Sequence, residues 1–174
     1  VEIPAGVTYL YEAAFNGGKF DTLILHEGLK NIYPCNFGNT PTLSRIITVG
    51  KNEGTPDIQT FPDSLTNIGR GAFDIDHSDS YNPDIPVQGL RGTLVLPEKI
   101  TLNNNCFEGQ TALTKIVAYC NSIWAGGYSD NISLGESGYY GCFYIKPYQY
   151  DDLYYFPPFW NCLGIEEIDL SQSS

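Results

Sequence analysis

Residues 61–73 read FPDSLTNIGRGAF, and this stretch holds the pattern that decides the fold. A hydrophobic residue opens it, a Leu-Thr-x-Ile run follows, and Phe73 closes it twelve residues after Phe61. Stretches of the same plan occupy residues 3–15, 25–37 and 96–107. The closing Phe lies twelve residues after the first hydrophobic residue in three copies and eleven after it in the fourth. Self-similarity of this kind is the sequence signature of a repeat protein.

Short segments rich in β-branched and aromatic residues recur between these stretches. Turn-forming Gly, Pro or Asn residues bound most of them, which is typical of short strands. They lie at residues 23–25, 46–49, 93–96, 116–119 and 143–145. Helical periodicity over eleven or more residues is almost absent, so we expect little regular helix.

One repeat of this size cannot bury both its strand side chains and its Phe without neighbours. Stacked repeats can, because each covers the open face of the next. We therefore expect a ladder of strands on one side and a column of buried phenyl rings on the other. The rings of this column are those of Phe15, Phe37, Phe73 and Phe107.

The pattern hydrophobe-Pro-x-x-Val/Leu-Thr-x-Ile followed by Ala-Phe resembles the BspA-like, or Treponema-type, leucine-rich repeats. The resemblance covers most of residues 1–120. Residues 143–174 resemble the closing segment of that family, with a strand, Pro147, a short Tyr-rich helix, Trp160 and a strand at 165–168. It implies an α/β leucine-rich-repeat solenoid, a strand-dominated right-handed coil of about five repeats of about 23 residues with a C-terminal aromatic cap. Members of the family are typically bacterial surface or secreted proteins used in adhesion and binding.

The domain organisation follows from the same pattern. We expect one domain, with repeats over residues 1–142, insertions at about 50–58 and 76–88, and a capping segment over 143–174. The first residues already read as the middle of a repeat and contain no signal peptide. We therefore expect an excised piece of a longer precursor that acts outside the cell or on the bacterial surface.

Composition excludes several classes of function. The 174 residues carry 9 basic and 20 acidic side chains, for a formal net charge of −11. A nucleic-acid-binding protein needs a basic face, and anionic membranes repel an acidic one. No apolar run approaches the roughly 20 residues that span a bilayer. We expect no nucleic-acid partner and no membrane insertion by this segment.

Catalytic and metal-binding patterns are missing from the sequence. The two histidines, His26 and His77, are far apart in the chain, and no Cys-x-x-Cys pair occurs. The sequence therefore predicts no enzyme activity, cofactor or metal site. An irregular Ca²⁺ site in residues 74–84 stays open as an alternative to a solvated acidic loop. Most of the five cysteines are interpreted as small buried residues, with a Cys120–Cys142 disulfide as the alternative.

Alternation along the predicted strands assigns two columns of side chains to their outer, concave face. The candidate binding residues of these columns are Ile24, His26, Ile47, Val49, Val95, Val117, Tyr119 and Tyr144. Soluble proteins rarely leave so apolar a stripe bare. It indicates either a face that binds an extracellular or host protein or partial cover by an insertion.

The C-terminal segment offers a second kind of binding surface. Eleven of the 22 residues from Tyr139 to Trp160 are aromatic. These rings either seal the last repeat or form a platform for a protein partner or for sugar rings, the latter including Tyr148 and Trp160. A structural spacer with no ligand is the remaining alternative.

Overall fold

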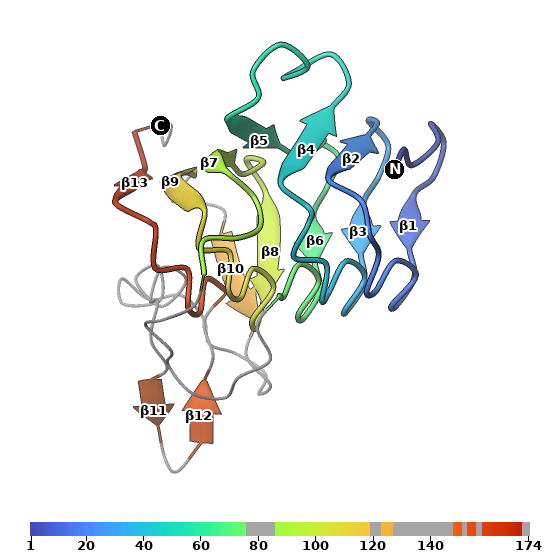
Figure 1. Cartoon of the computed structure of the whole chain (residues 1–174). Coiled ribbons are helices and arrows are strands. Elements are labelled where there is room, and N and C mark those ends of the chain that lie inside the picture. The colour runs from blue at the N-terminus through green and yellow to red at the C-terminus, as the bar shows by residue number, and fades with distance from the viewer. Residues whose placement is uncertain (76–85, 119–122, 127–147, 151–152, 156–157, 172–174) are drawn as a thin grey trace.

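The computed structural model describes residues 1–75, 86–118, 123–126, 148–150, 153–155 and 158–171. These residues form strands and turns and contain no helix, as the sequence predicts for a strand-dominated fold. Figure 1 shows most of the strands arranged in two rows, with the N-terminus at one end of the rows and the C-terminus near the other.

The first row is the predicted strand ladder, and it consists of two parallel sheets. One sheet has the order β2-β4 and the other β13-β9-β7-β5. The strands are β2 (Thr22–Leu25), β4 (Arg45–Thr48), β5 (Ile58–Thr60), β7 (Gly92–Val95), β9 (Leu113–Val117) and β13 (Glu167–Asp169). Side chains alternate along them: Leu23 and Leu25 are fully buried, whereas Ile24 between them is half-buried on the outer face.

The second row is one parallel sheet of order β1-β3-β6-β8-β10, which the repeat pattern had not predicted. Its strands are β1 (Tyr9–Leu10), β3 (Asn31–Ile32), β6 (Asn67–Ile68), β8 (Ile100–Asn103) and β10 (Ile123–Gly126). Three of them are only two residues long. The second residue of each short strand is an aliphatic side chain buried in the core, which lies between the two rows.

The predicted phenyl column is confirmed. The ring of Phe37 lies 5.3 Å from that of Phe15 and 5.1 Å from that of Phe73, and the rings are stacked in both pairs. Phe73 stacks in turn on Phe107 at 5.3 Å. The column continues one ring further than predicted, because Phe159 stacks on Phe107 at 5.2 Å.

The turns that hold these rings share a backbone feature. The residue two positions before Phe37 is Cys35, with φ of +53°, and the residue two positions before Phe107 is Asn105, with φ of +56°. Gly71 occupies the same place before Phe73. The left-handed region is costly for most side chains, so this recurring conformation fixes the direction of each turn at the same point of the repeat.

The first row is interrupted between β4 and β5. Loop 49–57 joins these strands, and no backbone ladder connects them. Buried Gln59 of β5 spans the gap: its Oε1 accepts the N–H of Ile46 at 2.7 Å, and its Nε2 donates to the carbonyl oxygen of Arg91 at 2.8 Å. The side-chain amide thus replaces the missing backbone partner of Ile46.

Asn52 fixes the interrupting loop in the same way. Its Oδ1 accepts the N–H of Thr48 at 2.8 Å, and its Nδ2 donates to the carbonyl oxygens of Ile46 and Ile58 at 2.8 and 2.6 Å. Only 2% of Asn52 is exposed. Because both ends of the amide are used in the interior, loop 49–57 is tied to both strands that it connects.

The C-terminal segment differs in part from the expectation. Residues Tyr148–Tyr150 (β11) and Leu153–Tyr155 (β12) pair as antiparallel strands, so the predicted short helix is wrong there. Tyrosine favours strands over helices, which explains this outcome. The strand expected at 165–168 is found as β13, parallel to β9, whereas the one expected at 143–145 lies outside the described residues.

Candidate functional site

The outer face of the first row is the candidate binding surface, and it is called the outer strand face below. Its central column comes from residues in register across the sheets. Glu2, Ile24 and Ile47 are aligned in one part. Thr60, Val95, Val117 and Asp169 are aligned in the other.

The structure brings the predicted site residues together in pairs. Ile24 lies beside Ile47, and Val95 lies beside Val117, with all four side chains half-buried. Sequence reasoning missed Thr60, because no strand was expected between the insertion at about 50–58 and the repeat that begins at Phe61. A polar residue therefore lies between the two apolar pairs, and the stripe is less continuous than the sequence suggests.

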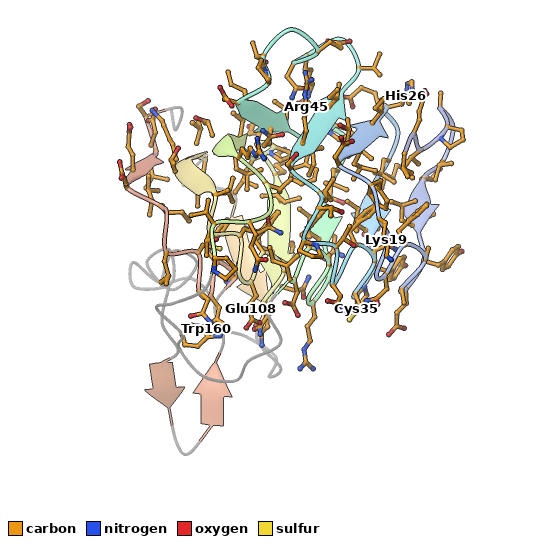
Figure 2. All side chains as sticks on the ribbon, viewed as in Figure 1. Lys19, His26, Cys35, Arg45, Glu108 and Trp160 are labelled. Atoms are coloured by element: carbon orange, nitrogen blue, oxygen red, sulfur yellow. The ribbon has the colours of Figure 1, made fainter. Side chains whose placement is uncertain are left out.

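The second predicted column begins with His26 and Val49. His26, labelled in Figure 2, directly follows β2. Its Nε2 lies 2.8 Å from Oε1 of Glu2. Val49 follows β4, and 43% of its surface is exposed, which makes it the most open predicted site residue with a described side chain. Tyr119 and Tyr144 lie outside the described residues.

A cavity of about 420 Å³ lies where β5 and β7 end. Its walls combine outer-face residues with charged residues from the neighbouring turns: Lys51, Thr60, Phe61, Asp63, Val95, Leu96, Pro97, Glu98 and Lys99. The cavity is continuous with the central column through Thr60 and Val95. It adds a concave, partly charged end to an otherwise β-branched surface.

An ion-pair network borders this cavity. The Nζ of Lys51 lies 2.6 Å from Oδ1 of Asp63 and 3.3 Å from Oε1 of Glu27. Both carboxylate oxygens of Glu27 also accept backbone N–H groups, from Asp63 at 2.9 Å and from Ser64 at 3.2 Å. Glu27 therefore ties the end of β2 to the turn after β5 across the interruption.

The pKa of Glu27 reflects these contacts. Partial burial raises it, but the two backbone N–H groups and Lys51 together hold the pKa below its ordinary value of 4.5. A lowered carboxyl pKa means that the contribution to stability is present above the ordinary value and is lost as the pH falls through the folded-state value.

Replacing Glu27 by Gln should therefore weaken the acid sensitivity of the fold. We expect the wild-type protein to lose more stability than E27Q between pH 7 and pH 3, because only the wild type has this carboxylate to protonate. Urea midpoints at the two pH values measure the difference. Glu166→Gln at an exposed position is the matched control, and an equal effect of both variants would contradict the role of Glu27.

Three cysteines fall in the described part of the chain, and all three are free thiols. Cys106 and Cys162 are buried, as the interpretation of small core residues requires, whereas Cys35 is exposed. Burial raises the pKa of Cys162 far above its usual range, and its Sγ donates to the carbonyl oxygen of Phe107 at 2.8 Å. Cys120 and Cys142 lie outside the described residues, so the disulfide stays a prediction.

The described residues were also compared with the requirements of a metal site and of a membrane span. Among the described residues, no group of three or more His, Cys, Asp or Glu side chains lies close enough to hold a metal ion. Most of residues 74–84, the alternative Ca²⁺ segment, lies outside that part of the chain. The described residues also contain no helix of the length and apolarity that a membrane span requires.

Two aromatic residues near the C-terminus are buried, which bears on the alternative of an aromatic binding platform. Trp160 and Phe159 are both fully buried. Figure 2 places Trp160 toward the C-terminal end of the rows. In that position the indole packs in the interior rather than forming an open platform, which supports the sealing role.

Comparison with known proteins supports the resemblance that the repeat pattern indicated. Residues 1–76 match the family model described as a BspA type leucine-rich repeat region (6 copies). Neither the curated proteins nor the solved structures include a match to the chain. The repeat pattern, the parallel sheets and this match agree. The chain thus contains, over residues 1–76, a leucine-rich repeat region of the BspA type.

Proposed function

We propose that the chain is a non-catalytic binding module of a bacterial surface or secreted protein that recognises an extracellular or host protein through the outer strand face. The family is typically found in surface proteins, which supports this location. The proposal includes a right-handed solenoid of about five repeats over residues 1–142, closed by residues 143–174.

The observation that carries the proposal is the partly open row of β-branched side chains. Ile24, Ile47, Val95 and Val117 are half-buried, and Val49 is exposed. An apolar central strip with charged residues around it has the composition of a protein-recognition surface. Lys115 with Glu167, at an Nζ–Oε1 distance of 2.7 Å, supplies charged residues near the C-terminal end of the strip.

The cavity beside β5 and β7 adds a place for a partner side chain. Its lining combines the apolar residues Phe61 and Val95 with Lys51 and Lys99. Lys51 is already paired with Asp63 and Glu27, so its geometry is fixed before a partner arrives. Preformed geometry of this kind reduces the entropy lost on binding.

A charge placed at an exposed residue of the outer strand face tests the proposal. Val49→Asp should weaken binding of the chain to its partner in a panel of purified extracellular-matrix proteins, measured by surface plasmon resonance, by about tenfold or more. Val87 is 81% exposed and lies outside the face, so Val87→Asp is the matched control and should leave binding unchanged.

Two results would contradict this function. One is the absence of binding to every protein of the panel. The other is concentration-dependent sedimentation of the wild-type chain that Val49→Asp abolishes, because the face would then join two copies of the chain rather than bind another protein.

A further inference from the structure

Three tyrosine side chains are exposed on the second row, away from the outer strand face. Tyr9 is 43% exposed, Tyr11 is 73% exposed and Tyr33 is 39% exposed. Tyr9 belongs to β1, and the other two directly follow β1 and β3. Exposed rings do not help to pack the core, so a cluster of them on the surface indicates a binding role.

The three rings form one cluster. Tyr11 and Tyr33 are parallel within 4°, with ring centroids 5.8 Å apart, and the ring of Tyr9 lies 6.5 Å from that of Tyr33 at a tilt of 45°. Mutual contact restricts how the rings can turn, so they lose little conformational freedom when a ligand packs on them.

Uncharged polar side chains continue the surface beside the rings. Asn31 is in register with Tyr9 and Asn67, and Asn67 is in register with Thr101. The Nδ2 of Asn103 donates to Oδ1 of Asn67 at 3.0 Å, which orients both amides. These four polar residues and the three tyrosines are called the tyrosine face below.

The chemistry of the tyrosine face follows from which kinds of side chain it exposes. None of its seven residues is charged, although the chain carries 29 charged side chains. The aliphatic residues of the same strands, Leu10, Ile32, Ile68 and Leu102, are all buried. The open surface therefore combines aromatic rings, phenolic hydroxyls, amides and one threonine hydroxyl.

Gly69 lets its backbone approach that of Tyr33 and Pro34 closely. It follows β6 as Tyr33 follows β3, and its missing side chain is a packing requirement, because a Cβ there would lie 2.6 Å from the N of Pro34 and 2.7 Å from the carbonyl carbon of Tyr33. As a result, no side chain follows Tyr33 along its column until Asn103.

We propose that the tyrosine face binds a neutral carbohydrate chain. The apolar face of a pyranose ring can pack on a tyrosine ring, while the amides of Asn31 and Asn67 and the phenolic hydroxyls offer donors and acceptors to sugar hydroxyls. The ligand is neutral because the face offers no charge to pair with one, and because the net charge of −11 repels acidic glycans. This inference goes beyond the proposed function and uses a different face.

The test uses the complete chain and four defined oligosaccharides. Isothermal titration calorimetry with cellohexaose, chitohexaose and mannohexaose should detect binding of at least one, and hexagalacturonate, which is acidic, should bind more weakly. Tyr11→Ala and Tyr33→Ala should each weaken binding by about tenfold, because each removes a stacking surface. Tyr33→Phe keeps the ring and should weaken binding only a few-fold.

Matched variants distinguish this site from the outer strand face. Val49→Ala should leave sugar binding unchanged, and Tyr11→Ala should leave protein binding unchanged. Tyr11 is largely exposed, so its replacement should preserve the melting temperature. The proposal is overturned if no neutral oligosaccharide binds, if hexagalacturonate binds most tightly, or if Tyr11→Ala has no effect on sugar binding.

Discussion

Replacing Phe73 by Ala should destabilise the protein by about 3–5 kcal/mol, the usual cost of removing a large buried aromatic side chain. The ring is fully buried and is stacked between Phe37 and Phe107, with Phe61 tilted against it at 5.6 Å. Its loss leaves a cavity in the middle of the column and uncovers both neighbours. Urea unfolding followed by circular dichroism measures the change.

Phe15 provides the control within the same column. Its ring stacks only on Phe37 in the column and is partly exposed, so Phe15→Ala should cost clearly less than Phe73→Ala. Phe73→Leu keeps most of the buried volume and should fall between the two. Equal losses for Phe15→Ala and Phe73→Ala would show that the column does not stabilise the stack through its central rings.

Replacing Gln59 by Leu should also destabilise the protein, by about 2–4 kcal/mol, although the repeat pattern favours Leu at this position. Its partner in β7 is Leu94, so the shape of the new side chain fits the ladder. The loss arises because the N–H of Ile46 and the carbonyl of Arg91 lose their side-chain partner in a buried site. Urea unfolding followed by circular dichroism measures the change in the free energy of unfolding.

Gln88→Leu is the matched control for this exchange. Gln88 is half-buried in the segment before β7, and the same change there should alter stability by less than about 1 kcal/mol. A stabilising effect of Gln59→Leu would contradict the bridging role and would indicate that burial of an aliphatic side chain outweighs both hydrogen bonds.

The parts of the fold that the sequence predicted rest on large side chains at regular spacing. Four phenyl rings at equivalent positions of the repeat lie in one stack, because each ring covers the next. Most strands of the first row were also predicted, because alternation of buried and outer residues is visible over four positions in β2 and β4.

Several of the strands that sequence reasoning missed have weak local patterns, although β8 alternates clearly over four residues. A two-residue strand such as β3 shows no alternation, and neighbouring units supply its hydrogen-bond partners. In β5, the inward position holds Gln59 instead of an aliphatic residue, so the segment reads as a loop. The amide is explained only by the structure, in which Gln59 bonds to the N–H of Ile46 in β4 and to the carbonyl oxygen of Arg91.

The binding surfaces were predicted to different extents. Ile24 and Ile47 lie side by side as expected, but Thr60 interrupts the apolar column where β5 enters the row. The alternative of an aromatic platform included Trp160, which is buried, whereas the open ring cluster contains Tyr11 and Tyr33 near the other end. The repeat pattern does not distinguish open from buried rings, because exposure depends on the neighbouring units.

The extra strand β5 has a geometric consequence for the shape of the molecule. In the second row, β3 pairs directly with β6, whereas in the first row both β4 and β5 lie between β2 and β7. A strand adds roughly 4.8 Å to the width of a sheet. The first row is therefore longer than the second by about one strand at this point, so the two rows cannot keep the same spacing between successive units.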